Sequence, residues 1–448
     1  MIKLGEEQAI AFDKIKSFIR SDKPAFSLTG PGGSGKSFLI STIIDWLEDT
    51  GIDYCLCAPT HKAKAVIKYY SKRDATTLHK LLSLSPNLDI IELDFKDLLF
   101  KMGKDSGMIP YKGLVICDEA SMISDDLFRI LLKKCSEFKS KILFISDKCQ
   151  LKPVDSDRVS LVYDLEDSFN LTKIYRQSSE SAIMPILETL RERQILHFNT
   201  STSESGNVFC ESNFIEFFNL CKDGIKRAID NQDIFESKIL AFTNNRVSNY
   251  NEAIAKHIFG DSKRWHKGEI LMGCENLKVN NYNFWNSMDY ILIKDPLPID
   301  IKVPYFMSLP AFKLSLYDTG NDETHSIKIL DKNIDPSIFE SLAAHIDNLR
   351  LQAIDATPKY RGIAWGKYYS ILDSFTTPID LRFDGRLIRK KSFDRGYALT
   401  IHKSQGSSYN NVYVDMADVM RNRDPENLRQ LQYVALSRTR GDTYIYQK

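Results

Sequence analysis

The chain of 448 residues is 43% hydrophobic and 27% charged, which excludes a single small module, a disordered chain and a fibrous chain. Its 60 basic and 59 acidic residues leave a net charge of +1, so any contact with a polyanion must come from local patches. No run approaches the roughly 18 apolar residues of a membrane span, and the eight cysteines are scattered, so we expect a cytoplasmic protein with reduced thiols and no membrane partner.

The first elements alternate between helical and strand-like patterns. Apolar residues recur at helical spacing over Glu6–Phe18, and a short strand-like run covers Ala25–Thr29. After a glycine-rich loop, Ser37–Leu47 is again helical, and Tyr54–Ala58 is the next apolar run. This order predicts a βαβ unit and therefore a parallel sheet.

Short apolar runs that end in polar residues follow further along the chain. They cover Leu114–Cys117, Ile142–Ile145 and Ile239–Phe242, and buried parallel strands have this pattern. Near the C-terminus, runs at 412–414 and 443–446 flank a helical stretch at Glu426–Arg438. Because one sheet would have to hold too many strands, we expect an α/β fold with two lobes.

Two stretches interrupt this alternation. Residues 81–111 are long enough for a hairpin or small protrusion, but not for a lobe. Residues 266–394 are rich in Tyr, Phe and Pro and contain alternating runs such as Asp289–Ile293, which favour an inserted, partly β subdomain.

The segment Gly30–Ser37 reads GPGGSGKS and fits the phosphate-loop pattern GxxxxGK[ST] between a strand and a helix. In such a loop, glycines let backbone N–H groups close around phosphate oxygens, and the helix N-terminus adds positive potential. Lys36 would reach the β- and γ-phosphates of ATP, and Ser37 would offer its hydroxyl to Mg²⁺. An ordinary glycine-rich turn is the alternative, but the flanking strand and helix favour a nucleotide site.

Polar residues at the ends of the next two strands extend this site. Asp118 can hold Mg²⁺ and Glu119 can polarise a water, although an acidic pair at a strand end is often merely solvated. Gln150, in SDKCQLKPV, would lie near the γ-phosphate, unless this segment is an ordinary turn. Arg176 and Arg438 are candidate arginine fingers, for which a surface salt bridge is the alternative.

Two cationic clusters are candidates for contact with a nucleic-acid backbone, which attracts cations and hydroxyl donors. The first lies between Pro59 and Lys80, and the second lies just before and within IHKSQG. The first contains Lys62, Lys64, Lys68, Lys72, Arg73 and Lys80, and the second contains Arg386, Arg389, Lys390, Lys391, Arg395, His402 and Lys403. A solvated helix face is the alternative for either cluster. Nothing resembles a sequence-reading motif, so we expect contacts to backbone and stacked bases.

In their order, these segments resemble the superfamily 1 helicases. The match runs through GPGGSGKS, APTHKAKA, TTLHKLL, LVICDEASM, SDKCQLKPV, LTKIYRQ, AFTNNRVSNYN, YALTIHKSQGSSY and YVALSRTR. The chain looks most like the 5′-to-3′ branch that includes the phage Dda and RecD-type helicases, because 81–111 is shorter than the insertion typical of the UvrD-like branch. Ser146 stands where the family usually has glycine, which puts the local turn in question.

The resemblance implies two RecA-like lobes with ATP between them, a small pin insertion in the first and a larger SH3-like insertion in the second. The first lobe would cover 1–80 and 112–178, the pin 81–111, the second lobe 179–265 and 395–448, and the SH3-like subdomain 266–394.

The resemblance also assigns residues to sites. Gln8 would read adenine, Glu119 would be the base for water, and Arg176 and Arg438 would reach the cleft from opposite sides. The other nucleotide residues would be Gly30, Gly32, Gly33, Ser34, Gly35, Lys36, Ser37, Asp118, Gln150, Gln405 and Gly406, with Mg²⁺ on Ser37 and Asp118. The DNA contacts would be Pro59, Thr60, His61, Lys62, Thr77, His79, Thr243, Asn244, Thr400, His402, Lys403 and Ser404. The strand-separation pin would use Phe95, Leu98 and Phe100, which could equally form a small apolar core.

The implied activity is that of an ATP-dependent DNA helicase, which moves 5′-to-3′ on single-stranded DNA, unwinds duplexes and displaces bound proteins. An RNA motor of the same superfamily and a nucleotide-gated DNA-loading protein without processive movement are the alternatives. The implied partners are single-stranded and forked duplex DNA, with a single-strand-binding protein or other replication proteins, and we expect a monomer. The compact format fits a phage accessory of DNA replication or recombination, which would act in the host cytoplasm.

Overall fold

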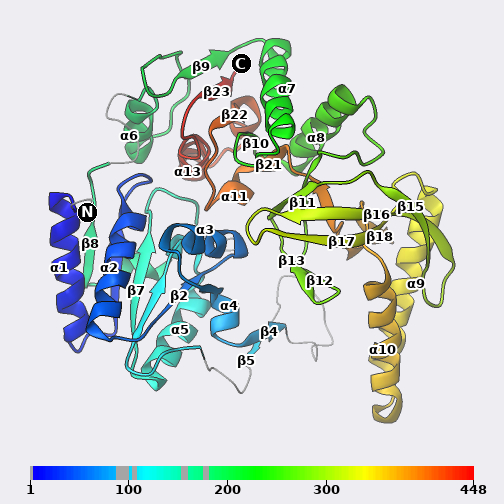
Figure 1. Ribbon diagram of the computed structural model, residues 1–448, viewed down its shortest axis with the longest axis horizontal. Coiled ribbons are helices and arrows are strands. Elements are labelled where there is room, and N and C mark those ends of the chain that lie inside the picture. Colours follow the sequence, from blue (N-terminus) through cyan, green and yellow to red (C-terminus); the bar gives the residue numbers. More distant parts are fainter. Residues whose placement is uncertain (1–3, 87–99, 103–107, 153–159, 175–180) are drawn as a thin grey trace. The chain divides into compact units, whose positions relative to one another are not determined.

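The computed structural model describes residues 4–86, 100–102, 108–152, 160–174 and 181–448 (Figure 1). The chain divides into two compact units. Unit 1 comprises Met1–Phe217, Leu240–Thr243 and Thr400–Lys448, and unit 2 comprises Phe218–Ile239 and Asn244–Leu399. Among the described residues, no helix has both the length and the apolar character that a bilayer crossing requires.

Unit 1 begins with a parallel sheet of six strands in the order β3-β2-β6-β7-β1-β8. The strands are β1 (Ala25–Thr29), β2 (Tyr54–Ala58), β3 (Ala75–Thr77), β6 (Leu114–Cys117), β7 (Lys141–Ser146) and β8 (Ser168–Asn170). The helices around it are α1 (Glu6–Arg20), α2 (Lys36–Thr50), α3 (His61–Ser71), α4 (Leu78–Leu81) and α5 (Asp125–Glu137), with 3-10 turns η1 (Ala120–Met122) and η2 (Leu161–Asp164). The predicted βαβ unit and parallel sheet are confirmed.

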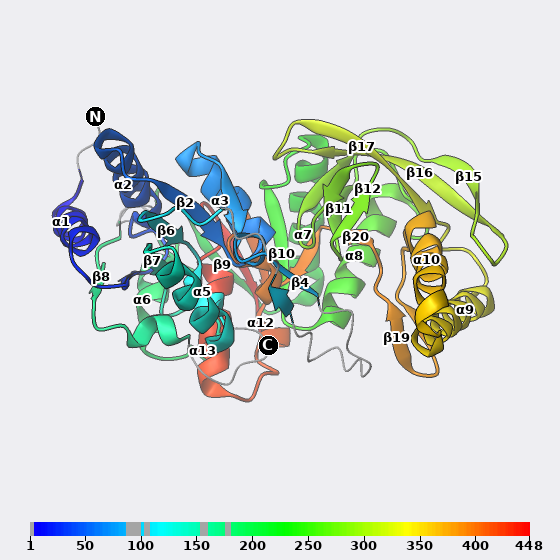
Figure 2. The same cartoon turned by 90° about the horizontal axis from the view of Figure 1, so that it is seen from below.

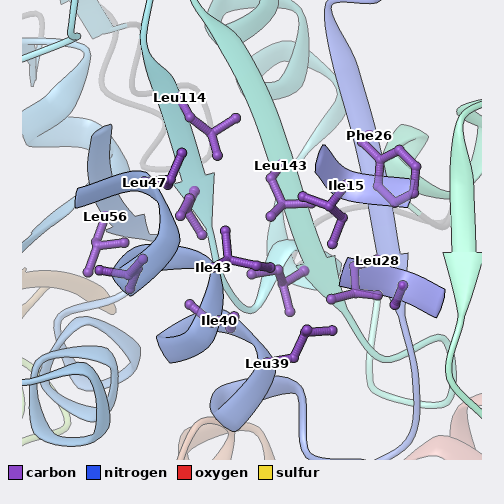
Figure 3. Packing of buried hydrophobic residues seen from close by; sticks show 14 of the residues in the cluster. Ile15, Phe26, Leu28, Leu39, Ile40, Ile43, Leu47, Leu56, Leu114 and Leu143 are labelled. Carbon is purple, nitrogen blue, oxygen red and sulfur yellow. The ribbon is translucent and has the colours of Figure 1, made fainter. Parts of the chain in front are cut away.

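Successive residues of these strands enter two different apolar cores. In β6, Leu114 and Ile116 pack with α1, α2 and α3, whereas Val115 and Cys117 pack with α4 and α5. Figure 3 shows the first core, in which Ile15 and Ile43 from two helices meet Leu28 and Leu143 from the strands. Helices therefore cover both faces, which explains why these strands read as continuous apolar runs in the sequence.

A second sheet has the order β21-β10-β22-β23-β9, and its pairs β22–β23 and β23–β9 are parallel. The strands are β9 (Val208–Glu211), β10 (Ser237–Ala241), β21 (Ala398–Thr400), β22 (Asn411–Asp415) and β23 (Thr443–Tyr446). The accompanying helices are α6 (Met184–Glu192), α7 (Phe214–Asp230), α11 (Ile401–Ser404), α12 (Met416–Val419) and α13 (Pro425–Leu436). With this second parallel region, the predicted α/β class holds for the chain.

Unit 2 is built on an antiparallel sheet in the order β15-β16-β14-β11-β20, with β17 paired to β16. The strands are β11 (Ile270–Gly273), β14 (Asp289–Leu292), β15 (Leu297–Lys302), β16 (Ser308–Asp318), β17 (Glu323–Leu330) and β20 (Phe393–Arg395). The unit also contains helix α8 (Asn244–Phe259) and two hairpins, β12 (Leu277–Val279) with β13 (Tyr282–Phe284) and β18 (Leu381–Phe383) with β19 (Arg386–Arg389). These strands lie in the region expected to be partly β, and its likeness to an SH3 fold stays a prediction.

Two long helices inside unit 2 were not predicted. Helices α9 (Pro336–Asp355) and α10 (Pro358–Ser374) lie side by side in both views (Figures 1 and 2). Helix α9 buries Phe339, Leu342, Ala343 and Ile346, a helical spacing that the composition of the surrounding segment concealed. Helix α10 buries only Ile371 among its residues, so it carries no apolar stripe from which a helix could be predicted.

The proposed pin lies mostly outside the described residues. This is the case for Phe95 and Leu98, whereas Phe100 begins β5 (Phe100–Met102). The backbone of β5 pairs antiparallel with β4 (Leu84–Pro86), which agrees with the hairpin expected in this stretch. The strand-separating role of these residues remains a prediction.

Candidate nucleotide and nucleic-acid site

The phosphate loop connects the end of β1 to the start of α2, as its sequence context requires. Gly33 and Gly35 have φ values of 85° and 76°, in the left-handed region that favours glycine. At Gly30, an added Cβ would lie 2.8 Å from Ser34 Oγ and 2.9 Å from Leu171 Cβ, so a larger residue does not fit. Lys36 Nζ donates to the carbonyls of Gly30 and Pro31, at 2.7 and 2.9 Å, which holds the ammonium over the loop.

The two carboxylates after β6 are held by different means. Asp118 accepts hydrogen bonds on both oxygens, from Glu119 N at 2.8 Å and from the Tyr70 hydroxyl at 3.0 Å. Glu119 has a left-handed φ of 52°, which a non-glycine residue adopts only at a cost. Burial raises the pKa of both carboxyls, that of Glu119 to about 7, and the charges of Arg438 and Lys36 oppose the rise at Glu119. Such a pKa suits a general base.

Asp147 is a further buried carboxylate at the loop. Its Oδ2 accepts from Gly32 N and from the Tyr433 hydroxyl, both at 2.9 Å, and its Oδ1 accepts from Cys149 N at 3.0 Å. The Tyr433 oxygen also lies 3.2 Å from Gly32 N. Helix α13 thereby contacts the phosphate loop directly within unit 1.

Arg438 and Gln8 are two further predicted site residues, both buried and both outside the phosphate loop. Arg438 is buried, and its guanidinium donates to Val434 O, Ser407 O and Ser437 Oγ at 2.9–3.2 Å. Gln8, also buried, donates to two loop carbonyls at 3.4 Å. The structure therefore places Gln8 against the phosphate loop. Arg438 is held by α13 and Ser407, and its charge opposes the rise in the pKa of Glu119. The second candidate finger, Arg176, lies outside the described residues.

Ser34 Oγ in this loop is buried and has no hydrogen-bond partner among the described residues, and the same holds for Gln150 Oε1, three residues after Asp147, and for Gln405 Nε2. Buried polar atoms are usually satisfied, and the Ser34 hydroxyl is of the kind that can donate to a phosphate oxygen. Mg²⁺ prefers oxygen donors and phosphate oxygens, and Asp118 with Ser37 offers such donors. The residues thus fit a magnesium nucleotide, with Asp118 and Ser37 as the candidate ligands of the metal.

The candidate DNA contacts gather at the first turns of three helices. Thr60, Thr77 and Thr400 each cap a helix, of α3, α4 and α11, by accepting a hydrogen bond from the backbone three residues later. Pro59 precedes the first of these caps, and His79 and His402 lie inside α4 and α11. The threonine hydroxyls are thus engaged in fixing the helix starts.

Positive charge is concentrated around the start of α3. Burial, and then the charges of Lys64, His79 and Lys80, lower the pKa of His61 to about 4. Burial and the charges of Lys80 and Lys68 also lower the pKa of Lys64. Burial is the larger cause at both groups, and the repulsion that Lys80 and Lys68 add at Lys64 favours a bound polyanion.

Lys62 and Ser404 are two further candidate DNA contacts, and their side chains are engaged within the protein. Lys62 Nζ lies 3.3 Å from both Lys403 O and the Tyr409 hydroxyl, which ties α3 to α11 within unit 1. Ser404 is fully buried and donates to Ile401 O, so its side chain has no surface to offer DNA in this structure.

The remaining predicted pair follows β10. Thr243 is engaged with Asp418 through its backbone N–H at 2.8 Å and its hydroxyl at 3.1 Å. Asn244 is the first residue of α8, in unit 2. Thr243 is thus anchored to the body of unit 1, and its contact with DNA stays a prediction.

The first part of the second cationic cluster is largely paired with carboxylates within unit 2. Arg395 is paired with Glu269 at 2.8 Å, Arg386 with Asp347 at 3.1 Å, Arg389 with Glu275 at 3.6 Å, and Lys391 with Asp394. In three of the four pairs, the carboxylate lies far from its cation in the sequence. Counting the charges along one segment therefore could not reveal this pairing. Arg389 and Arg395 are buried by these contacts, whereas the Arg386 side chain is 58% exposed, and the role of the cluster toward DNA stays a prediction.

Sequence reasoning missed Tyr70, Asp147 and Tyr433. Asp147 and Tyr433 stand inside the motifs SDKCQLKPV and YVALSRTR, so their motifs were a signal that they lie at the site. Tyr70 lies 48 positions from Asp118, and no local pattern indicates their hydrogen bond.

Comparison with known proteins agrees with this site. A family described as AAA domain matches residues 3–211, and a family described as UvrD-like helicase C-terminal domain matches residues 395–446. The first part of the chain is therefore similar to an AAA domain and its last part to a UvrD-like helicase C-terminal domain.

Individual relatives narrow this class. The chain is 26% identical to the ATP-dependent DNA helicase Dda of Enterobacteria phage T4, over 98% of both chains. It is 31% identical to the RecD2 DNA helicase of Deinococcus radiodurans over 40% of this chain and 23% of the relative. Both relatives are ATP-dependent DNA helicases, and together with the family matches they confirm the resemblance to superfamily 1 helicases found in the motifs. The fold is that of a Bacteroides Pif1 helicase solved with ADP-AlF3 and single-stranded DNA, with a TM-score of 0.52, 18% identity, and coverage of 99% of this chain and 92% of that one.

Proposed function

We propose that this protein is an ATP-dependent DNA helicase that moves 5′-to-3′ along single-stranded DNA and unwinds duplexes. The observation that carries the proposal is the arrangement of unit 1, in which the phosphate loop, buried Glu119 and Arg438 occur together with the cationic start of α3. A unit of this kind can hydrolyse a nucleotide and respond to a bound polyanion.

The hydrolytic roles follow from the chemistry of each group. Lys36 would bind the transferred phosphate, and Glu119, with its raised pKa, would accept a proton from the attacking water. Arg438 would stabilise negative charge in the transition state, and the NH₂ group of the Gln150 amide would donate a hydrogen bond to the γ-phosphate. Mg²⁺, held by Asp118 and Ser37, would neutralise phosphate charge.

On the DNA side, the proposed contacts are phosphate contacts without base reading. His61, Lys62, His79 and Lys403, with the capping threonines around them, would position the backbone of a single strand. We keep Gln405 and Gly406 as nucleotide residues and Arg176 as the second finger. The lobe boundaries and the pin residues remain part of the proposal as the sequence predicted them.

The proposal is tested by ATP hydrolysis with and without an oligonucleotide, and then by unwinding of duplexes that carry either a 5′ or a 3′ tail. We expect single-stranded DNA to stimulate hydrolysis many-fold, only the 5′-tailed duplex to open, and Lys36→Ala to abolish both activities. Full hydrolysis without any polynucleotide would exclude a motor, and opening of the 3′-tailed duplex alone would reverse the polarity.

Two alternatives are separated in the same assays. Stronger stimulation by RNA than by DNA of the same sequence would favour an RNA motor. Stimulated hydrolysis without strand displacement would favour a DNA-loading protein. Forked DNA, a single-strand-binding protein and other replication proteins are the partners we propose for a monomer, in the cytoplasm of a host cell if the protein comes from a phage.

A further inference from the structure

Helix α3 connects two parts of the proposed machinery. Its first residues, His61 and Lys62, are proposed DNA contacts, and its penultimate residue, Tyr70, donates a hydrogen bond to Asp118 Oδ2 at 3.0 Å. At about 1.5 Å per residue, the two ends of the helix are about 14 Å apart. One short helix therefore joins the candidate DNA contacts to the candidate metal carboxylate.

Both ends of the helix are packed against other parts of unit 1. Ala63 and Ile67 are buried in the apolar core shared with α1 and α2, and Tyr70 packs against the same core. At the other end, Lys62 contacts Lys403 O. A Cβ added to Gly406 would lie 3.5 Å from Ala63 Cα, so the two backbones approach closely there. A displacement of the start of α3 would consequently be transmitted to the position of Tyr70.

The Tyr70 hydroxyl also fixes an oxygen that nothing else among the described residues holds. Asp118 Oδ1 accepts from the adjacent backbone of Glu119, so it stays in place whatever α3 does. Asp118 Oδ2 has the Tyr70 hydroxyl as its partner. Hydrogen bonds from a second layer of residues orient the carboxylates that bind metals and set their affinity.

We propose that Tyr70 is a positioning residue, which orients the Asp118 carboxylate for Mg²⁺ and links it through α3 to the DNA contacts at the start of the helix. This inference rests on the proposed function, because it names a route by which DNA regulates the nucleotide site. It assigns Tyr70 no contact with nucleotide or DNA.

The experiment compares Tyr70→Phe with Tyr69→Phe, which removes the hydroxyl of a neighbouring tyrosine that is 74% exposed. The first measurement is the binding of a fluorescent ATP analogue during Mg²⁺ titration without DNA, and the second is ATP hydrolysis with and without single-stranded DNA. We expect Tyr70→Phe to raise the half-saturating Mg²⁺ concentration about tenfold and to reduce the stimulation by DNA, while Tyr69→Phe behaves as wild type.

The outcomes separate the possible roles. A Tyr70→Phe protein with the Mg²⁺ dependence and the DNA stimulation of wild type would overturn the inference. A loss of stability with an unchanged Mg²⁺ titration would also overturn it, because a purely structural tyrosine has this signature. Nucleotide binding without Mg²⁺ at wild-type affinity verifies that the variant is folded. If DNA fails to stimulate the wild type, the helicase proposal fails, and the Mg²⁺ titration still decides the role of Tyr70 at Asp118.

Discussion

The Tyr433 hydroxyl donates a hydrogen bond to Asp147 Oδ2 at 2.9 Å, and the same carboxylate oxygen accepts from Gly32 N in the phosphate loop. These residues belong to α13 and to the loops after β7 and β1, all within unit 1. A buried carboxylate needs such donors, because an unpaired one loses its hydration without compensation. Asp147 is therefore the point at which the C-terminal helix is fixed to the nucleotide site.

Tyr433→Phe removes one donor from this buried carboxylate and leaves the aromatic ring in place. Hydrogen bonds to charged groups contribute about 1.5–3 kcal/mol, so we expect the free energy of unfolding to fall by about that amount. Urea unfolding followed by circular dichroism measures it. The control is Tyr69→Phe, whose exposed hydroxyl should change stability by less than about 0.5 kcal/mol. Equal effects of the two substitutions would contradict the role given to the Asp147 contact.

Glu119→Gln keeps the shape of the side chain but removes the basic carboxylate. We expect the variant to bind ATP as wild type does and to hydrolyse it about 10²–10⁴-fold more slowly, because a positioned general base contributes a factor of this size. Nucleotide binding and single-turnover hydrolysis measure the two effects separately. Glu137→Gln, at the exposed end of α5, is the matched control. Normal turnover by Glu119→Gln would remove Glu119 from its proposed role.

The parts of the fold that follow from local patterns were predictable from the sequence. Strand β6 and the loop at Lys36 were found because continuous apolar runs and a glycine-rich loop reflect buried strands and phosphate binding directly. Helix α10 was not found, because it buries only Ile371 among its residues and so has no periodic apolar face.

At the site, side-chain contacts between residues far apart in the sequence could not be predicted. Arg395 looked like part of a phosphate track, but its partner Glu269 is 126 positions away. Tyr70 likewise depends on Asp118, which no spacing rule connects to it. Side-chain pairing of this kind is decided by the tertiary fold, so only coordinates reveal which charges remain available to a ligand.

The low pKa of His61 predicts a pH dependence of stability. The imidazole titrates near 6.5 in the unfolded chain and at about 4 in the folded protein, so between these values the unfolded chain binds the proton and the folded protein does not. The contribution of His61 to the free energy of unfolding is therefore fully present above pH 6.5 and is lost as the pH falls toward 4. Because the ring is partly exposed and screened, we expect about 1 kcal/mol between pH 7 and pH 5.

This dependence is measured by urea unfolding of wild type and His61→Gln at the two pH values. The variant should lose less stability than wild type on going from pH 7 to pH 5. His257→Gln, at the end of α8, serves as the control and should keep the wild-type dependence. An identical pH dependence in His61→Gln and wild type would show that His61 is already free to take up the proton in the folded state.

Arg395→Met tests the buried ion pair of Arg395 with Glu269, in a segment that the sequence predicted to contact phosphates. The guanidinium bonds to Glu269 at 2.8 and 3.3 Å and to the carbonyls of Ser262 and Arg264, and it lies 5.0 Å from the centre of the Trp265 ring. Loss of one partner of a buried pair costs about 3–5 kcal/mol, because the other charge stays buried without compensation. We expect a decrease of that size in the free energy of unfolding, measured in urea at pH 7.

The pH dependence and a second substitution identify the cause. Burial already raises the pKa of Glu269, and Arg395 opposes this rise, so in Arg395→Met the carboxyl should bind a proton more readily. A carboxyl whose pKa is raised by folding stabilises the folded protein at low pH, and this contribution is lost as the pH rises. The difference in the free energy of unfolding between wild type and Arg395→Met should therefore be smaller at pH 5 than at pH 7. Adding Glu269→Gln should recover part of the loss at pH 7, since the uncompensated charge is then gone. The control is Arg382→Met, which removes a cation whose side chain is 58% exposed and should change the free energy of unfolding by less than about 0.5 kcal/mol. Similar effects of the two arginine substitutions would mean that the pair of Arg395 with Glu269 contributes no more than a surface contact.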